Sequence, residues 1–194
     1  MDNLEDFLRS RTTKNKHDIT HTRIGLASEG IYPGKYCIKE EDLSLFYKLY
    51  NQKVFVSNKE EYLTEVQYKN DDIGPLLVDL DFRYDVNIKE RQHQTEHIFD
   101  TVETYIDTLS NIYNFDDNSS IMVYVMHKDN VNVISDGKDG KNITKDGIHI
   151  VFGIAVDHIT QCIIRDKVLE TIGMVYTDLP LKNSYNDVLD EGIS

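Results

Sequence analysis

Features that mark secreted or membrane-spanning proteins are scarce in this chain of 194 residues. It has only two cysteines, Cys37 and Cys162, whose wide separation matches neither a disulfide framework nor a zinc knuckle. Its longest apolar runs fall far short of the roughly 20 residues that cross a bilayer. The acidic N-terminus contains no apolar signal core. These absences predict an intracellular protein in a reducing compartment, with no membrane partner.

Basic residues are also few. The chain has 21 lysines and arginines against 34 acidic residues, and its net charge is −13 at pH 7. This balance argues against a broad nucleic-acid groove held by phosphate contacts. It does not exclude a small catalytic cleft, because acidic residues that bind metals also make the net charge of the chain more negative. The locally basic stretch over residues 9–23 is predicted to be a solvated arm, since charge runs usually lie on the surface.

With three prolines, no repeats and no low-complexity tract, the chain shows no linker and reads as one domain, or one domain with a small appendage. Hydrophobic periodicity predicts helices over residues 4–11, 40–52, 92–113 and 158–175. It predicts strands around Asp79, over residues 121–127 and over residues 147–153. Residues 129–146 are polar and rich in Gly, Asn and Lys, which indicates an exposed loop.

The order of these elements predicts an α+β fold. After residue 75 they run β-α-β-β-α, the split βαβ arrangement of a ferredoxin-like or RNA-recognition-motif-like sheet. We expect this core to occupy residues 71–194, after an N-terminal helical α/β extension over residues 1–70. In such a sheet the first and third strands lie side by side and antiparallel, and the helices cover one face.

The most informative segment is the strand over residues 76–83, Leu-Leu-Val-Asp-Leu-Asp-Phe-Arg. Its side-chain period of two turns the apolar residues to one face and Asp79 and Asp81 to the other. Two acids side by side on a strand repel each other. A divalent cation removes that repulsion, and Mg²⁺ or Mn²⁺ favours such oxygen ligands. The segment therefore predicts a metal site on an uncovered sheet face.

A second strand contributes to the same face in this topology. The alternation of Gly147-Ile-His-Ile-Val-Phe-Gly turns His149 away from the apolar side and toward the two acids. Lys145 lies where the preceding loop enters this strand, in reach of a phosphate. Two acids with a nearby histidine fit metal-dependent nucleotidyl transfer, in which the metal clamps a triphosphate.

These motifs resemble those of a known family. Val78-Asp-Leu-Asp-Phe-Arg83, followed by Lys145-Asp-Gly-Ile-His149, is similar to the first two motifs of archaeo-eukaryotic primases, the primase-polymerase superfamily. The nearer likeness is to the N-terminal primase domain of primase-helicases from giant nucleocytoplasmic DNA viruses. It extends over nearly the whole chain, through His-Thr-Arg-Ile-Gly from His21 and Tyr-Leu-Thr-Glu-Val-Gln from Tyr62. Val188-Leu-Asp190 looks like the third motif of the family.

The resemblance implies a nucleotidyltransferase, a DNA primase or DNA-directed polymerase of viral replication. It implies that Asp79, Asp81 and Asp190 bind two divalent metals, Mg²⁺ or Mn²⁺, and that His149 and Lys145 contact the incoming triphosphate. Implied partners are template and primer DNA, nucleoside triphosphates, and a helicase domain or other replication proteins, in the viral factory of the host cytoplasm. In the family a strand and a Ser-x-Lys-type segment follow the third motif, whereas this chain ends four residues after Asp190. The core is therefore expected to be incomplete, and weak or inactive alone.

Two other functions compete with this one. The first is a catalytically silent module, which keeps the same sheet to dock a helicase or another replication protein. The second is a zinc metallopeptidase, because His93-Gln-Thr-Glu-His97 matches H-x-x-E-H, with Glu96 as the base and Glu170 as a further ligand. Residues 136–142 resemble a calcium loop only superficially, and the tyrosines fall at helical core spacing rather than as a base-stacking platform.

Overall fold

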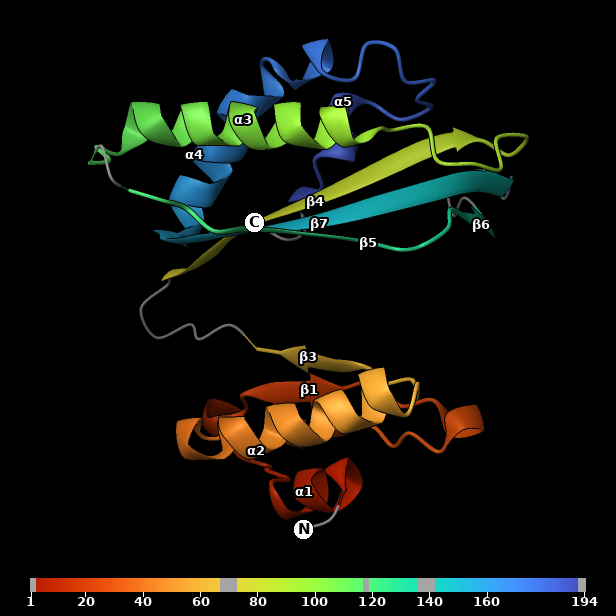
Figure 1. The fold of residues 1–194 in the computed structure, drawn as a ribbon, viewed down its shortest axis with the longest axis vertical. Helices are drawn as coiled ribbons and strands as arrows, with labels where there is room; N and C mark the ends of the chain where they lie inside the picture. The colour runs from red at the N-terminus through yellow and green to blue at the C-terminus, as the bar shows by residue number, and fades with distance from the viewer. Residues whose placement is uncertain (1–2, 67–72, 117–118, 136–141, 192–194) are drawn as a thin grey trace. The chain divides into compact units, whose positions relative to one another are not determined.

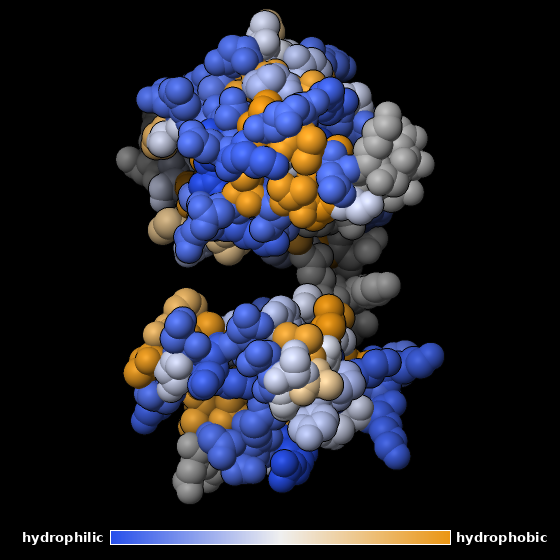
Figure 2. All heavy atoms as spheres, turned by 90° about the vertical axis from the view of Figure 1, so that its right-hand side faces the viewer, coloured by the Kyte–Doolittle hydropathy of each residue, from blue (hydrophilic) through white to orange (hydrophobic). Residues whose placement is uncertain are grey.

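The computed structural model describes residues 3–66, 73–116, 119–135 and 142–191. The chain forms two compact units, Met1–Asp71 and Asp72–Ser194 (Figure 1). Both units combine helices with antiparallel sheets, which confirms the predicted α+β class. On the face of the molecule shown in Figure 2, the surface of each unit is largely hydrophilic, with apolar side chains gathered in patches.

The smaller unit is built on a three-stranded antiparallel sheet in the order β2-β1-β3. Its strands are β1 (His21–Arg23), β2 (Gly34–Tyr36) and β3 (Leu63–Glu65). The helices α1 (Leu4–Ser10) and α2 (Glu40–Asn51) confirm the two predicted N-terminal helices, and a π-helical turn (Gln52–Val56) follows α2. Short 3₁₀ turns span Lys16–Asp18 and Ala27–Glu29. The buried core consists of Leu4, Phe7, Leu8, Tyr36, Ile38 and Phe46.

The prediction that residues 9–23 form a solvated arm is wrong at its C-terminal end. His21 and Arg23 are both 4% exposed, because they lie on the buried face of β1, the central strand of this sheet. The Arg23 guanidinium forms ion pairs with Glu5 and Glu61, and Lys53 contacts both of these carboxylates. The basic residue is therefore part of a buried charge network and is not available to an external partner.

The larger unit contains a four-stranded antiparallel sheet with the long strand β7 (Asn142–Asp157) at its centre. β7 pairs on one side with β4 (Ile73–Asp85), and on the other with β5 (Val123–His127) and β6 (Asn132–Ser135). The helices α3 (Thr95–Ile112) and α4 (His158–Leu169) lie on one face of the sheet (Figure 1). A 3₁₀ turn (Ile172–Met174) and the short helix α5 (Tyr185–Val188) follow. The antiparallel pairing of β4 with β7 confirms the predicted split βαβ topology.

Several boundaries differ from the sequence-based prediction. Residues 129–146 are not one exposed loop, because β6 lies within them and β7 begins at Asn142. The inward positions of this part of β7 are the polar residues Thr144 and Asp146, so no apolar alternation marks the strand. Residues 136–141, which include most of the calcium-loop-like segment, lie outside the described residues. The last long helix ends at Leu169 rather than at residue 175.

The core of the larger unit lies between the sheet and its two helices. The inward residues of β4 and β7 are almost fully buried against side chains of α3 and α4. Because the side-chain period of a strand is two, a shift of register by one residue would expose this whole set. The inward strand residues are Val78, Leu80, Phe82, Ile148, Ile150 and Phe152. The helix residues of the same core include Tyr105, Leu109, Ile164 and Val168. No helix in the described part of the chain is long and apolar enough to cross a membrane.

Candidate active site

We call the sheet face opposite α3 and α4 the open face. On it, Asp79 of β4 is directly opposite His149 of β7, which is in turn opposite Met126 of β5. Directly opposed residues of antiparallel strands project to the same face, so these three side chains form one row. The next row along β4 begins with Asp81, opposite Gly147. The sequence-predicted placement of both acids and His149 on one face is therefore what the strand register produces.

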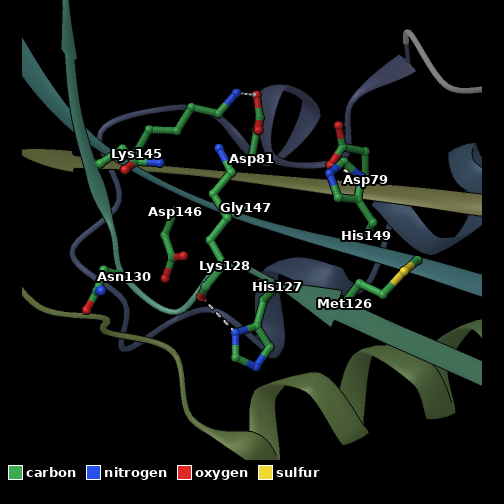
Figure 3. A pocket seen from close by; sticks show the side chains of 11 residues that line it. Asp79, Asp81, Met126, His127, Lys128, Asn130, Lys145, Asp146, Gly147 and His149 are labelled. Atoms are coloured by element: carbon green, nitrogen blue, oxygen red, sulfur yellow. Dashed lines mark hydrogen bonds and ion pairs between the residues drawn. The ribbon is translucent and has the colours of Figure 1, made fainter. Parts of the chain in front are cut away.

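Each acid contacts a basic neighbour. Asp79 Oδ1 lies 3.2 Å from His149 Nδ1, and Asp81 Oδ2 lies 2.7 Å from Lys145 Nζ (Figure 3). Arg83 is more distant, with Nη2 4.0 Å from Asp81 Oδ2. The four sequence-predicted residues of these two strands thus form two adjoining acid–base pairs.

A pocket of about 320 Å³ opens beside these pairs. This volume falls within the range of small-molecule sites. Gly147 forms part of its wall, and a Cβ at that position would lie 3.8 Å from Asp81 Oδ1. A larger side chain there would therefore fill the space in front of this carboxylate. The lining residues are Asp79, Asp81, Met126, His127, Lys128, Asn130, Asn132, Lys145, Asp146, Gly147 and His149.

The local electrostatics disfavour negative charge on Asp79. Burial raises the pKa of this carboxyl most; the neighbouring acids Asp81 and Asp190 raise it further, and His149 and Lys145 oppose them. A divalent cation would offset both the burial and the repulsion, and carboxylate oxygens are the ligands that Mg²⁺ and Mn²⁺ prefer. The donor set therefore fits such a metal. Within residues 3–66, 73–116, 119–135 and 142–191, however, no group of three His, Cys, Asp or Glu side chains is already arranged around one metal position.

The third predicted acid, Asp190, lies next to the first. Its backbone N–H donates to the carbonyl oxygen of Asp79 at 3.0 Å, and the preceding Leu189 forms a bridge to β4. Asn183 also contacts this edge, since its Nδ2 donates to the Asp81 carbonyl oxygen at 2.7 Å. Residues 183–190 therefore follow the edge of β4 that β7 does not occupy, and they bring Asp190 to the two acids of the first motif.

Comparison with known proteins identifies the family. The family model described as "C962R protein N-terminal AEP domain" matches residues 27–194. The chain belongs to this family. AEP domains are of the archaeo-eukaryotic primase type, so the resemblance seen in the sequence motifs is confirmed. The match begins inside the smaller unit and extends through the larger one.

A viral relative supports the same conclusion. The chain is 26% identical over 163 residues to "Putative helicase L207/L206" of Acanthamoeba polyphaga mimivirus. The alignment covers 82% of this chain but only 16% of the mimivirus protein. Together, the AEP family and this helicase-named relative support a replication role related to that of the primase-helicases of giant viruses.

Arg165 of α4 is a residue of this AEP domain that sequence reasoning missed. Its guanidinium is buried, and Nε and Nη2 donate to the carbonyl oxygen of Leu189 at 3.0 and 2.6 Å. Nη2 also donates to the carbonyl oxygen of Asn186 at 3.0 Å. Arg165 therefore fixes the segment that carries Asp190. The sequence did contain a signal, because Arg165 lies among the apolar positions of a predicted helix. Arginine is rarely buried without a partner, so an arginine at such a position indicates a specific buried contact.

Replacing Arg165 by methionine is expected to destabilise the AEP domain by about 1–3 kcal/mol, because the buried carbonyl oxygen of Leu189 loses both of its guanidinium donors. If Asp79 and Asp190 share a divalent metal, its binding should also weaken, since Asp190 is no longer held beside Asp79. Urea unfolding and calorimetric metal titration measure the two effects. Lys167→Met, on the exposed side of the same helix, is the matched control. If the two variants behave alike, Arg165 does not hold this segment.

A second missed feature lies under the pocket. Asp146, which is 2% exposed, accepts hydrogen bonds from Arg91 Nε at 2.9 Å and from Arg91 Nη2 at 3.1 Å. The same guanidinium contacts His127 Nδ1 and the Lys128 carbonyl oxygen. Arg91 therefore connects the segment before α3 to β7 and to the end of β5. His93 packs beside Asp146, and burial lowers its pKa to about 4.

The geometry that the zinc-peptidase interpretation requires is absent. α3 begins at Thr95, so His93 precedes the helix and does not share a helical face with His97. Both ring nitrogens of His97 have other partners: Nδ1 accepts from the Gln94 backbone N–H, and Nε2 lies 3.0 Å from Asp178 Oδ1. The H-x-x-E-H match therefore consists of a buried histidine before the helix and a histidine in the N-terminal cap of α3, and it does not provide two zinc ligands on one helical face.

Proposed function

We propose that this AEP domain catalyses metal-dependent, template-directed nucleotidyl transfer, as a DNA primase or polymerase of viral replication. The observation that carries the proposal is the arrangement of Asp79 and Asp81 on the open face, each paired with a basic residue and both lining one pocket. Such a site offers oxygen ligands for a metal and positive charge for a phosphate chain, side by side.

Each residue has a distinct role in this proposal. Asp79, Asp81 and Asp190 would hold the divalent metals, Mg²⁺ or Mn²⁺, which supply charge neutralisation and a lowered pKa of the attacking hydroxyl. His149 and Lys145 would bind the triphosphate and orient its α-phosphate. The 3′-hydroxyl of one nucleotide then attacks that phosphorus in line, a new P–O bond forms, and pyrophosphate leaves.

The partners in this proposal follow from the reaction and the relative. The reaction requires template DNA, a primer end and nucleoside triphosphates. The chain spans about 16% of the length of the helicase-named mimivirus protein, so a helicase domain is a natural partner in replication. The whole assembly would act inside the infected cell, where viral DNA is copied.

Removing either side chain that faces the phosphates is expected to weaken nucleotide binding. Lys145→Met and His149→Ala should each lower the affinity for a deoxynucleoside triphosphate by about 10- to 150-fold, because hydrogen bonds to charged groups contribute about 1.5–3 kcal/mol. Calorimetric titration in the presence of Mg²⁺ measures this loss. Lys89→Met, which removes an exposed lysine outside the pocket, is the matched control. Unchanged affinity in both pocket variants would remove the triphosphate site from the proposal.

Nucleotide incorporation on a primed single-stranded template tests the reaction itself. Incorporation should require Mg²⁺ or Mn²⁺ and stop when EDTA is added. Triphosphate binding without incorporation, even in the full-length protein, would instead favour the silent docking module.

A further inference from the structure

The open face continues beyond the pocket as an apolar surface. Tyr124 of β5 is directly opposite Val151 of β7, which is opposite Leu77 of β4. This row adjoins the row of Asp79, His149 and Met126. We call Leu77, Tyr124, Met126 and Val151 the apolar platform. The sequence-based interpretation placed the tyrosines in the core, which is wrong for Tyr124, because its side chain belongs to the open face.

The exposure of this platform needs a physical reason. Tyr124 is 58% exposed and Met126 is 49% exposed on the edge strand β5, whereas the inward residues of β4 and β7 are packed on the other face of the sheet. Apolar groups clustered on a surface next to a polar site are typical of a binding surface rather than of a solvated one. Met126 belongs to both surfaces, since it also lines the pocket. The platform is therefore continuous with the candidate active site.

Chemical character changes along β7 in one direction. The outward residues are, in order, Lys145, Gly147, His149 and Val151, and Tyr124 flanks the last of them. The six residue steps from Lys145 to Val151 span on the order of 20 Å. A positive charge thus stands at one end, the acids and the histidine in the middle, and the apolar platform at the other end. A nucleoside triphosphate has the same sequence of groups: phosphates, sugar and an aromatic base.

The distance between Tyr124 and His149 suits a nucleotide that extends from the phosphate site toward the apolar platform. Tyr124 and His149 are diagonal neighbours on adjacent strands, a separation of about 7–8 Å. A phosphate bound at His149 and Lys145 leaves the attached nucleoside to extend toward Tyr124 or away from it. The direction toward Tyr124 offers an exposed aromatic ring, and an aromatic ring stacks on the π-face of any base.

We propose that the apolar platform stacks the base of the nucleoside triphosphate whose phosphates bind at His149 and Lys145. The proposal rests on the proposed function, because it assigns the base subsite of the same nucleotide. Tyr124 supplies the stacking ring, and Met126 and Val151 exclude water beside it. Because stacking does not read hydrogen-bonding groups, this subsite accepts all four bases with similar affinity.

The absence of tryptophan in the chain allows a direct test. Tyr124→Trp places one indole on the platform, and its fluorescence should be quenched by Mg²⁺-bound deoxynucleoside triphosphates but not by inorganic tripolyphosphate. Phe99→Trp is the matched control, because Phe99 is 68% exposed on α3, on the opposite face of the sheet. Quenching of both indoles, or of neither while the nucleotide binds, overturns the proposal.

Truncation gives an independent measurement. Tyr124→Ala should weaken deoxynucleoside triphosphate binding by about 5- to 150-fold, the range for loss of one aromatic–base stack, and leave tripolyphosphate affinity unchanged. An equal loss for both ligands, or no loss for either, overturns the base subsite and leaves the phosphate site and the proposed function standing. If neither ligand binds the unmodified chain, both proposals fail.

Discussion

Replacing Asp79 and Asp81 together by asparagine is expected to lower nucleotide incorporation by at least about a thousand-fold. The two side chains keep their shape but lose the negative charge that would hold the divalent metals. Metal ions contribute several kcal/mol to stabilising the charge of the phosphoryl-transfer transition state, and each ~1.4 kcal/mol is a factor of ten in rate. The rate of incorporation on a primed template, at saturating Mg²⁺, measures the effect.

The same variant should stay folded, and this separates a catalytic role from a structural one. Because burial and neighbouring acids raise the pKa of Asp79, its charged form is unfavourable in the fold, and a neutral amide removes that cost. We therefore expect the free energy of unfolding without metal to be unchanged or higher. Asp85→Asn, on the same strand but outside the pocket, is the control for charge loss. Retention of even a tenth of the wild-type rate would show that these acids do not carry the reaction.

The strands that hold the site could be predicted because their apolar faces alternate strictly. The alternation of Val78, Leu80 and Phe82 on one strand, and of Ile148 and Ile150 on the other, fixes which face of each strand points into the core. The two acids and His149 must then lie on the opposite face, which is the open face. The roles of Asp79, Asp81, Asp190, His149 and Lys145 remain predictions, because geometry shows where side chains lie and not what they bind.

Two of the missed features share a physical cause, which is that polar residues occupy buried positions where apolar residues are expected. The first part of β7 buries Thr144 and Asp146, and a pattern search interprets such residues as a loop. Arg165 is held by backbone carbonyls, and these carry no residue-specific mark in the sequence. Tyr124 lies in the run Ile-Met-Val-Tyr-Val-Met, whose uniform hydrophobicity hides which residues face outward. The pairing with β7 is what shows that Tyr124 lies on the open face.

The two units also differ in charge in a way that total composition concealed. Met1–Asp71 contains 11 basic and 12 acidic residues, whereas Asp72–Ser194 contains 10 and 22. The excess of negative charge is therefore a property of the larger unit, which carries the candidate metal ligands. In the smaller unit, part of the positive charge is buried and already neutralised by acids.

The buried charge network of the smaller unit leads to the second large expected effect. Arg23→Met should lower the free energy of unfolding of this unit by about 3–5 kcal/mol, the usual loss when one partner of a buried ion pair is removed. Arg23 Nε donates to Glu61 Oε1 at 2.7 Å, and Nη1 donates to Glu5 Oε2 at 2.9 Å. The side chains of Arg23 and Glu61 are 1% and 0% exposed, so water cannot replace the lost bonds.

A second substitution in the same network, at Glu61, tests whether the unpaired charge causes the loss of stability. Burial works against ionisation of Glu61, yet Arg23 and Lys53 together keep the pKa of this carboxyl below its ordinary value. Without Arg23, one lysine faces two carboxylates, so the additional change Glu61→Gln should recover part of the lost stability by removing the unpaired charge. Arg9→Met, at an exposed position of α1, should change the urea midpoint little. If Arg23→Met and Arg9→Met unfold at the same urea concentration, the buried network contributes nothing to the stability of this unit.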